Sequence, residues 1–256
     1  MLSSSGRRWP AGGEWVLEPK WDGYRLLVDV GADGRVRIWS RHGTSLTDRV
    51  GPLVEAFAPA PARSVFDGEL VVLSDRDGRP TQDFAAVTRA VFAGSPEAVA
   101  RLTFVGFDVL RLAGEDQRVR PWRERNAALR DALPVSGRVR LITTQPASVE
   151  AHAALVALGF EGTVLKRPRS AYRPGRQSAW VKHKARCGAQ GVLLSVHQDR
   201  DGQWQAICNV EGRRVRALAG ARSSTLIGRP VSILYSRVDA DGGLREARLA
   251  SVPVGS

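Results

Sequence analysis

The sequence predicts an α+β fold in which a mixed region of strands and helices is followed by a small all-β barrel. Three observations lead to this prediction. Apolar runs that alternate like strands and stretches with helical spacing are interleaved through residues 1–186. Residues 187–256 instead show short strand patterns separated by Asp/Gly turns, which is typical of an OB-fold barrel. This change of pattern places a domain boundary between residues 186 and 187.

The first region begins with a polar, glycine-rich stretch, residues 1–13, which we expect to be a loose lead-in. Its strands are predicted at residues 15–30, 35–40, 64–73, 102–110, 161–166 and 179–184. Its helices are predicted at residues 46–57, 82–92, 121–133 and 148–158. The barrel strands are predicted at residues 192–197, 204–210, 213–218, 231–236 and 244–252.

Composition indicates a globular protein with a polyanionic partner. The chain has 256 residues and a formal net charge of +12, which favours nucleic acid as the partner. Compositional drift toward arginine is the alternative explanation. The two cysteines, Cys187 and Cys208, show no metal-binding spacing, so we expect free thiols in a reducing cytoplasm. No apolar run reaches the length of a membrane span, so we expect a soluble cytoplasmic protein without a membrane partner.

Lysine is rare in this arginine-rich chain. It occurs only at positions 20, 166, 182 and 184, so 34 of the 38 basic residues are arginine. An ammonium can lose its proton and become a nucleophile, whereas a guanidinium cannot. The four lysines are therefore candidates for chemistry that arginine cannot perform, with Lys20 as a covalent nucleophile.

The stretch Leu17–Val28 surrounds this lysine with further functional groups. Gly23 would allow a backbone or a ligand to approach closely, and Arg25 offers a fork for a phosphate or a carboxylate. Asp22 lies between Lys20 and Gly23. The alternative is the start of a strand with a solvated Lys–Asp pair.

Two acidic motifs can hold a cation. Asp67 and Glu69 are expected on one face of a strand because side chains alternate. Such carboxylates are costly in an apolar strand unless they bind a metal, a cation or sugar hydroxyls, although the face could also be open to solvent. Glu161 opens another apolar strand that ends at Lys166. Strict alternation puts these two on opposite faces, so we expect Glu161 in the site and Lys166 outside it unless a bulge intervenes.

The stretch Trp180–Lys184 completes the set. Strand alternation places Trp180, Lys182 and Lys184 on one strand face. Two ammonium groups so near each other need a shared anion, and a phosphate fits. A solvated basic face is the alternative. A nucleophilic lysine, acids for a divalent metal and lysines for a phosphate together match covalent nucleotidyl transfer from a nucleoside triphosphate.

The motifs in their order resemble those of the ATP-dependent DNA ligases, which belong to the covalent nucleotidyltransferases together with RNA ligases and capping enzymes. The motifs are Glu18–Arg25, Ser40–Gly43, Phe66–Leu70, Phe107–Leu110, Glu161–Lys166 and Trp180–Lys184. The segment Ser170–Ser178 is similar to bacterial end-joining ligases of the ligase D and ligase C type. The resemblance covers residues 15–186 and implies a nucleotidyltransferase (adenylation) domain at 1–186 and an OB-fold domain at 187–256.

The resemblance implies a role for each motif residue. Lys20 would carry AMP, Glu18 would lie by the adenine, and Phe107 would stack on the base. Arg25 and Arg41 would face the ribose and phosphate or the 5′-phosphate of a nick. Glu69 and Glu161 would hold Mg²⁺, with Mn²⁺ as an alternative, and Glu69 would also contact the ribose. Lys182 and Lys184 would grip the α-phosphate, with Asp22 and Lys166 in support.

The two ends of the chain bear on the cofactor and on the last motif. Only fourteen residues precede Trp15, which leaves no room for a nicotinamide-recognising domain and favours ATP as the donor. In the family a basic motif near the end of the OB domain orients the departing pyrophosphate. Arg245 and Arg248 are the candidates here, although they lack the proline and aromatic of that motif and could belong to an ordinary edge strand.

Three functions remain open. The first is a minimal ATP-dependent DNA ligase, expected as a monomer, that seals nicked or broken double-stranded DNA in repair, with end-joining or repair proteins as partners. The second is a related RNA ligase or capping-type enzyme. The third is a nucleic-acid-binding module with impaired ligation. A nick, a double-strand end and an RNA-containing junction are all compatible substrates.

Overall fold

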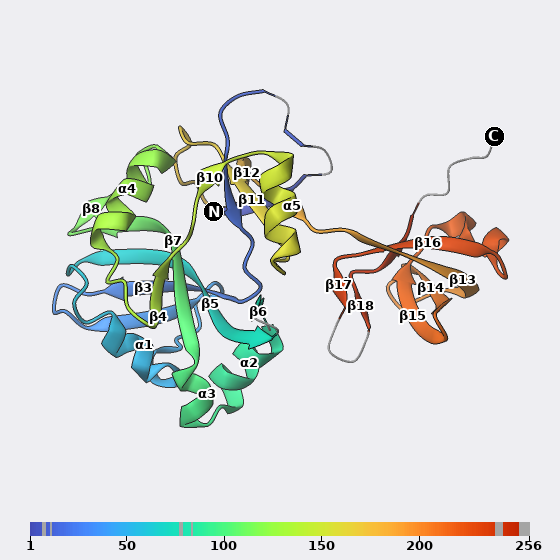
Figure 1. The fold of residues 1–256 in the computed structure, drawn as a ribbon. Helices are drawn as coiled ribbons and strands as arrows, with labels where there is room; N and C mark the ends of the chain where they lie inside the picture. Colours follow the sequence, from blue (N-terminus) through green and yellow to red (C-terminus); the bar gives the residue numbers. More distant parts are fainter. Residues whose placement is uncertain (7–8, 11, 77–78, 83, 239–242, 251–256) are drawn as a thin grey trace. The chain divides into compact units, whose positions relative to one another are not determined.

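The computed structural model describes residues 1–6, 9–10, 12–76, 79–82, 84–238 and 243–250, and it consists of two compact units (Figure 1). They comprise Met1–His183 and Lys184–Ser256, so the division lies slightly before the boundary expected at 186/187. Strand β12 (Arg176–Lys184) is followed almost at once by β13 (Cys187–Gln198). The division therefore falls inside a nearly continuous extended stretch, where composition gives little signal.

The first unit is built on two sheets. A five-stranded sheet has the order β1-β12-β11-β2-β10, with β1 Leu2–Ser5, β2 Val16–Pro19, β10 Gln145–Pro146 and β11 Gly162–Lys166. A seven-stranded sheet has the order β4-β3-β5-β7-β8, with β6 paired to β5 and β9 paired to β7. Its strands are β3 Tyr24–Val30, β4 Val36–Ser40, β5 Ser64–Arg76, β6 Arg79–Gln82, β7 Leu102–Leu112, β8 Glu115–Asp116 and β9 Val139–Leu141.

One face of the seven-stranded sheet is covered by α1 Gly51–Ala56, α2 Phe84–Ala93, α3 Pro96–Ala100 and α4 Trp122–Ala132. Helix α5 (Val149–Ala157) packs on the five-stranded sheet instead. Alternate residues of β3 and β5, such as Leu26 and Phe66, are fully buried in the core that α1 to α4 close. The other face of the seven-stranded sheet is turned toward the five-stranded sheet, and a second hydrophobic cluster that contains Phe107, Trp122 and Trp180 lies between them.

The stretch predicted as one strand at residues 15–30 is two strands. Strand β2 belongs to the five-stranded sheet and β3 to the seven-stranded sheet, so residues Lys20–Gly23 cross from one sheet to the other. Gly23 permits this crossing, because a Cβ there would lie 2.2 Å from the carbonyl oxygen of Leu70. The close approach expected at this glycine is thus an approach of the backbone, and Lys20 stands where the two sheets meet.

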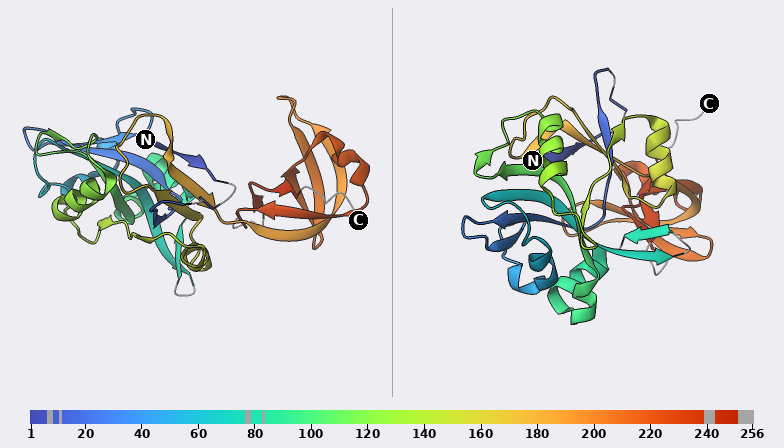
Figure 2. Two further views of the ribbon diagram at one scale, coloured as in Figure 1. Left: turned by 90° about the horizontal axis from the view of Figure 1, so that it is seen from above. Right: turned by 60° about the vertical axis from the view of Figure 1, so that its left-hand side comes forward.

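Three other expectations are corrected. Residues 1–13 are not simply a loose lead-in, because β1 pairs in parallel with β12, as the dark blue strand in Figure 2 shows. Residues 46–57 form a short 3₁₀ helix, Thr47–Arg49, and then α1, which begins anew beside a proline. Residues 244–252 form two strands, β18 Leu244–Arg245 and β19 Arg248–Leu249, because Glu246 has a left-handed φ of 51°; residues 251 and 252 lie outside the described residues.

The second unit contains a closed five-stranded barrel, as predicted for an OB-fold. Its order is β13-β14-β15-β19-β16, with β14 Trp204–Val210, β15 Arg213–Leu218 and β16 Pro230–Tyr235. A 3₁₀ helix, Ala221–Leu226, connects β15 to β16, and a small ribbon pairs β17 (Arg237–Val238) with β18. Small side chains such as Ala206, Cys208 and Ala217 fill the interior, because so small a barrel has little internal space.

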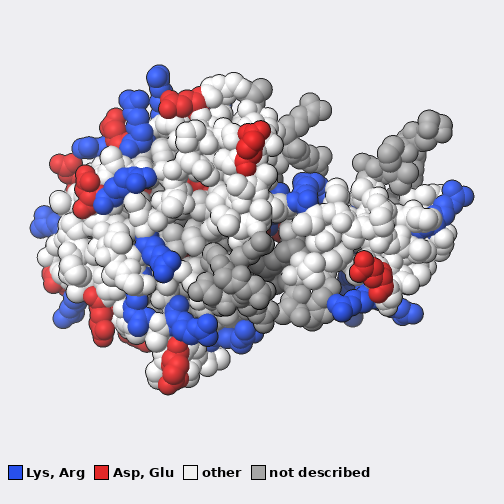
Figure 3. Space-filling view, in the orientation of Figure 1, with Lys and Arg blue, Asp and Glu red and all other residues white. Residues whose placement is uncertain are grey.

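The distribution of surface charge agrees only in part with the polyanionic partner expected from the net charge. On the face seen in Figure 3, the described Lys and Arg side chains are interspersed with Asp and Glu and form no continuous basic tract. Within the described part of the chain, none of the helices has both the length and the apolar character needed to cross a membrane. The two cysteines are unpaired, as predicted.

Candidate active site

A pocket of about 250 Å³ lies between the two sheets of the first unit. Seven residues that the sequence predicted for the site line it, namely Glu18, Lys20, Arg25, Arg41, Glu69, Phe107 and Lys182. Lys166, which strand alternation had placed outside the site and only the family resemblance placed in support of it, lines the pocket too. The lining residues that the sequence analysis did not assign are Leu2, Ser3, Pro19, Trp21, Ile142, Val164, Arg176 and Trp180. Trp180 and Arg176 could have been found, because both share the alternating face of β12 that carries Lys182. Leu2, Ser3 and Ile142 give no such signal.

Lys20 directly follows β2 and is held at both its backbone and its side chain. Its amide donates to the carbonyl oxygen of Gly162 over 2.9 Å, and its ammonium forms an ion pair with Glu161. The two side chains keep 21% and 9% of their surface exposed. Lys20 lines the pocket, whereas Glu161 contacts Lys20 without being one of the lining residues. A nucleophile and an acid that are far apart in sequence thus meet because β2 and β11 are antiparallel neighbours.

The expectation that Glu161 and Lys166 point to opposite faces, with Lys166 outside the site, is wrong. Glu161 lies before β11 rather than in it, and the next residue, Gly162, has a φ of 147°. Strand alternation therefore does not apply between the two residues. Lys166 lines the pocket and forms an ion pair with Glu18 over 2.7 Å.

Glu69 places a second carboxylate near Lys20. It faces Arg25 across the β3–β5 register, and the charge of Lys20 acts on it. Burial raises the pKa of Glu69 to about 7, and the positive charges of Lys20 and Arg25 oppose that rise. Ionising this buried carboxyl without a partner is costly, and a bound cation would stabilise its charged form.

Glu69 and Glu161 fit a divalent cation that takes most of its other ligands from a substrate. No group of three or more His, Cys, Asp or Glu side chains in the described ranges is arranged to hold an ion by itself. Mg²⁺ is commonly held by one or two carboxylates together with substrate phosphates and water. Glu161, which contacts the Lys20 ammonium, and Glu69, on which the Lys20 charge acts, match that pattern.

Glu18 forms part of the pocket wall with only 2% of its surface exposed. Oε2 is paired with Lys166, whereas Oε1 has no hydrogen-bond partner among the described residues. A buried oxygen without a donor is costly, so this atom fits a donor that arrives with a ligand.

Arg25 lines the pocket, but its donors are engaged within the protein. Nε and Nη2 donate to Asp67 over 2.9 and 2.6 Å, and Nη1 donates to the carbonyl oxygen of Met1 over 2.7 Å. Burial acts to lower the pKa of Arg25, and the Asp67 carboxylate outweighs it and raises the pKa. The fork predicted for a phosphate is thus occupied by Asp67, and the guanidinium lies 5.2 Å from the centre of the Phe107 ring.

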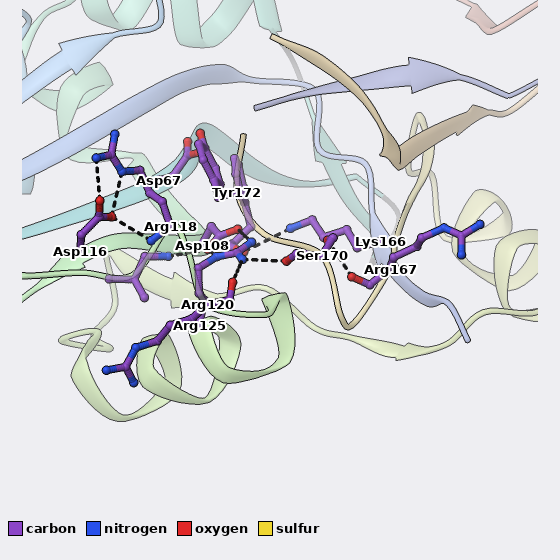
Figure 4. A network of polar contacts seen from close by, with 12 residues as sticks. Asp67, Asp108, Asp116, Arg118, Arg120, Arg125, Lys166, Arg167, Ser170 and Tyr172 are labelled. Atoms are coloured by element: carbon purple, nitrogen blue, oxygen red, sulfur yellow. Dashed lines mark hydrogen bonds and ion pairs between the residues drawn. The ribbon is translucent and has the colours of Figure 1, made fainter. Parts of the chain in front are cut away.

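A buried polar network supports this wall from behind (Figure 4). The hydroxyl of Tyr172 donates to Asp67 over 2.7 Å, and the Tyr172 ring lies 5.7 Å from the guanidinium of Arg125. Arg125 makes a two-bonded ion pair with Asp108, and both side chains are fully buried. It also donates to the carbonyl oxygen of Ser170 over 2.9 Å. The segment between β11 and β12 is thereby fixed to α4 and β7.

Three predicted residues lie in the second unit and outside the pocket lining. Lys184 forms an ion pair with Glu246 of the same unit. Arg245 pairs through its backbone with Arg237, and Arg248 lies in the barrel strand β19. Asp22 also does not line the pocket, but its charge raises the pKa of Glu69, so it lies near the site.

The family model described as "ATP dependent DNA ligase domain" matches residues 8–184. The chain is 38% identical over 198 residues to the multifunctional non-homologous end joining protein LigD of Pseudomonas aeruginosa, which covers 75% of this chain and 22% of that protein. It is 39% identical over 201 residues to a probable DNA ligase of Streptomyces griseus subsp. griseus, which covers 73% of this chain and 39% of that protein. The chain thus spans well under half the length of these two relatives.

Solved structures share the fold. The ligase domain of LigD from M. tuberculosis superimposes with a TM-score of 0.61 at 22% identity, covering 97% of this chain and 92% of that one. A Lig E DNA ligase structure, described as DNA binding with a minimal scaffold, gives a TM-score of 0.67 at 17% identity over 94% of this chain and 92% of that one. At these identities the likeness shows the architecture, which includes the nucleotidyltransferase domain and the barrel.

Proposed function

The chain belongs to the family of ATP-dependent DNA ligase domains, and on that premise we propose that it forms a covalent Lys20–AMP intermediate and uses it to join DNA ends. The observation that carries the proposal is the position of Lys20. It lies where the two sheets meet, paired with Glu161, at the edge of a pocket whose wall contains an unpartnered acceptor on Glu18.

In the first step the amine of Lys20 attacks the α-phosphorus of ATP. The Lys20 ammonium gives up its proton, an N–P bond forms, and the bond to the bridging oxygen of pyrophosphate breaks. Glu161 is the carboxylate in contact with that ammonium. Lys182 and Arg41 line the same pocket and offer positive charge to the phosphate oxygens, a role for which Lys184 is also proposed.

A divalent metal, which we propose to be Mg²⁺ or Mn²⁺, would be held by Glu69 and Glu161. When bound, it neutralises charge on the phosphate oxygens. Burial raises the pKa of Glu69 to about 7, and a bound cation would favour its ionised form.

The part of the pocket wall formed by Glu18 and Phe107 supports adenine as the base that binds there. Oε1 of Glu18 has no partner among the described residues and would accept from the 6-amino group of adenine. Phe107 lines the pocket and offers an aromatic ring for stacking on the base. The same arrangement disfavours guanine, because its 6-oxo group would face a carboxylate.

In the later steps AMP passes to a DNA 5′-phosphate and a 3′-hydroxyl displaces it, which seals the strand. The names of the relatives support this part of the proposal, since they include a non-homologous end joining protein and probable DNA ligases. We propose nicked or broken duplex DNA as the substrate, end-joining or repair proteins as partners and a monomer as the acting species. The net charge of +12 favours a binding affinity that falls with salt.

Labelling with ATP tests the first step directly. Incubation with α-³²P-ATP and Mg²⁺ should leave label on the denatured protein, and γ-³²P-ATP should leave none. Lys20→Arg keeps the positive charge but cannot act as a nucleophile, so it should lose the label while duplex binding persists. Label that survives in this variant, or label from GTP alone, would contradict the proposal.

Sealing assays test the later steps separately. A nicked duplex and the same duplex carrying a pre-formed 5′-adenylate are offered to the wild-type chain. Sealing of both supports a complete ligase. Sealing of the pre-adenylated duplex alone would place a defect in the first step, and sealing of neither would reduce the function to adenylation and binding.

A further inference from the structure

The pair Glu18–Lys166 is a buried ion pair in the pocket wall. The two side chains keep 2% and 1% of their surface exposed, and Nζ of Lys166 lies 2.7 Å from Oε2 of Glu18. The same ammonium donates to the carbonyl oxygen of Phe107 over 3.2 Å. Its position is therefore set by two acceptors on two different sheets.

Aromatic rings surround this ammonium on its other sides. Nζ lies 4.0 Å from the ring centre of Trp180, 4.9 Å from that of Phe107 and 5.9 Å from that of Trp122. Aromatic faces attract a cation, and the attraction is strongest where water is excluded. The buried ammonium is paired with Oε2 of Glu18, and Oε1 is left without a hydrogen-bond partner among the described residues.

We propose that Lys166 is the residue that sets the base preference of the pocket, because it keeps Glu18 a charged acceptor. The proposal rests on the proposed function, in which ATP is the substrate. A carboxylate accepts a hydrogen bond from the 6-amino group of adenine and repels the 6-oxo group of hypoxanthine or guanine. A neutral carboxyl has an O–H and can donate to that 6-oxo group, so protonation of Glu18 would remove the discrimination.

The charges around Glu18 determine which form is present. Lys166 faces it from β11, Asp108 from β7 and Arg125 from α4. Burial raises the pKa of Glu18 to about 7 and Asp108 adds to the rise, while Lys166 and Arg125 lower it. Below that pH the carboxyl is neutral and above it the carboxylate forms. Removal of the Lys166 charge would therefore extend the neutral form to higher pH.

The experiment compares adenylation with inosinylation. Rates of covalent labelling of Lys20 are measured with ATP and with ITP from pH 6 to pH 9, and the ratio of the two kcat/KM values is plotted against pH. Effects on Lys20, the metal and the phosphates are common to both nucleotides and cancel in this ratio. The wild-type ratio should be on the order of 10²-fold or more at high pH and should fall below about pH 7.

Lys166→Met should lower the ratio at pH 7.5 at least tenfold and move the midpoint of its pH profile upward by roughly 1–3 units. Methionine has a similar length and packs well on aromatic rings, so the wall should keep its shape. Lys182→Met is the matched control, because it removes a pocket ammonium that does not touch Glu18. It should slow labelling by both nucleotides and leave their ratio within about twofold, since the base acceptor is intact.

Glu18→Gln provides a second, independent variant. Its amide offers both a donor and an acceptor and does not titrate, so the ratio should be low and independent of pH. If Lys166→Met does not fold, this variant and the wild-type profile decide the matter. A wild-type ratio that stays flat through pH 7 overturns the proposal.

The outcomes separate this inference from the proposed function. Absence of covalent labelling with ATP at any pH would overturn the function itself. Normal ATP labelling, together with an unchanged ratio and midpoint in a folded Lys166→Met protein, would overturn only the role of Lys166. A lowered ratio with an upward shift supports both.

Discussion

Replacement of Arg125 by methionine should destabilise the first unit strongly. The guanidinium makes two bonds to Asp108, of 2.7 and 2.8 Å, and donates to the carbonyl oxygens of Arg120 and Ser170 over 2.7 and 2.9 Å. Both charged side chains are fully buried. Removing one partner of such a pair leaves an uncompensated charge and typically costs about 3–5 kcal/mol. Set against a total of about 5–15 kcal/mol for a domain, this is a large loss.

The assay is thermal and urea unfolding followed by tryptophan fluorescence. For a unit of this size the expected loss corresponds to a fall of roughly 6–20 °C in Tm. Arg123→Met is the matched control, because the side chain of Arg123 is exposed on the same helix. It should change stability by no more than about 0.5 kcal/mol. At temperatures where Arg125→Met is still folded, its KM for ATP should rise, since Arg125 anchors the segment that joins β11 to β12.

A loss below about 1 kcal/mol in Arg125→Met would refute this reasoning, because it would mean that Asp108 tolerates burial unpaired. The double variant Asp108→Asn with Arg125→Met gives a second check. It leaves no unpaired charge, so it should be more stable than the sum of the two single losses predicts. Strict additivity would show that the two side chains do not act as a pair.

Three further predictions follow from the site. Glu161→Gln should nearly abolish labelling of Lys20 by ATP at neutral pH with little change in Tm, because it removes both the partner of Lys20 and a proposed metal ligand. Labelling within twofold of wild type would contradict this. The Mg²⁺ concentration for half-maximal labelling should rise as pH falls through about 7, because the pKa of Glu69 is raised to that value and its neutral form is a poor ligand. Glu69→Gln should flatten this pH profile. A flat wild-type profile would argue against Glu69 as a ligand. Gly23→Ala should lower both Tm and labelling, because its Cβ would meet the Leu70 carbonyl oxygen at 2.2 Å, whereas Gly137→Ala, with open space around the Cβ, should change neither markedly.

Several features of the site could be predicted because they depend on local order. Lysine scarcity and strand alternation predicted Lys20, Glu69 and Lys182 as site residues, and all three line one pocket. Their roles as nucleophile, metal ligand and phosphate contact stay predictions. Their identities are properties of short stretches of sequence, and strand alternation correctly put Trp180 and Lys182 on one face. The barrel was predicted in the same way, from the spacing of short strands and turns.

Other features depended on which strands become neighbours. Alternation failed at Glu161 because this residue lies outside β11, before a glycine with unusual backbone geometry. The occupation of the Arg25 fork by Asp67 and the pairing of Glu18 with Lys166 also follow from sheet pairing rather than from local sequence. These contacts join residues far apart in the chain, so a local pattern contains no record of them.

The sequence by itself determined the chemical inventory of this protein, which is a rare lysine, two acids proposed as metal ligands, basic residues proposed as phosphate contacts and a terminal barrel. Only the tertiary structure decided how Lys166 and Arg25 are used. The break at Lys20–Gly23 sends β2 and β3 into different sheets and leaves Lys20 where they meet. Burial between those sheets then fixes which charges must pair, because an ion removed from water requires a partner and the fold determines which one is within reach.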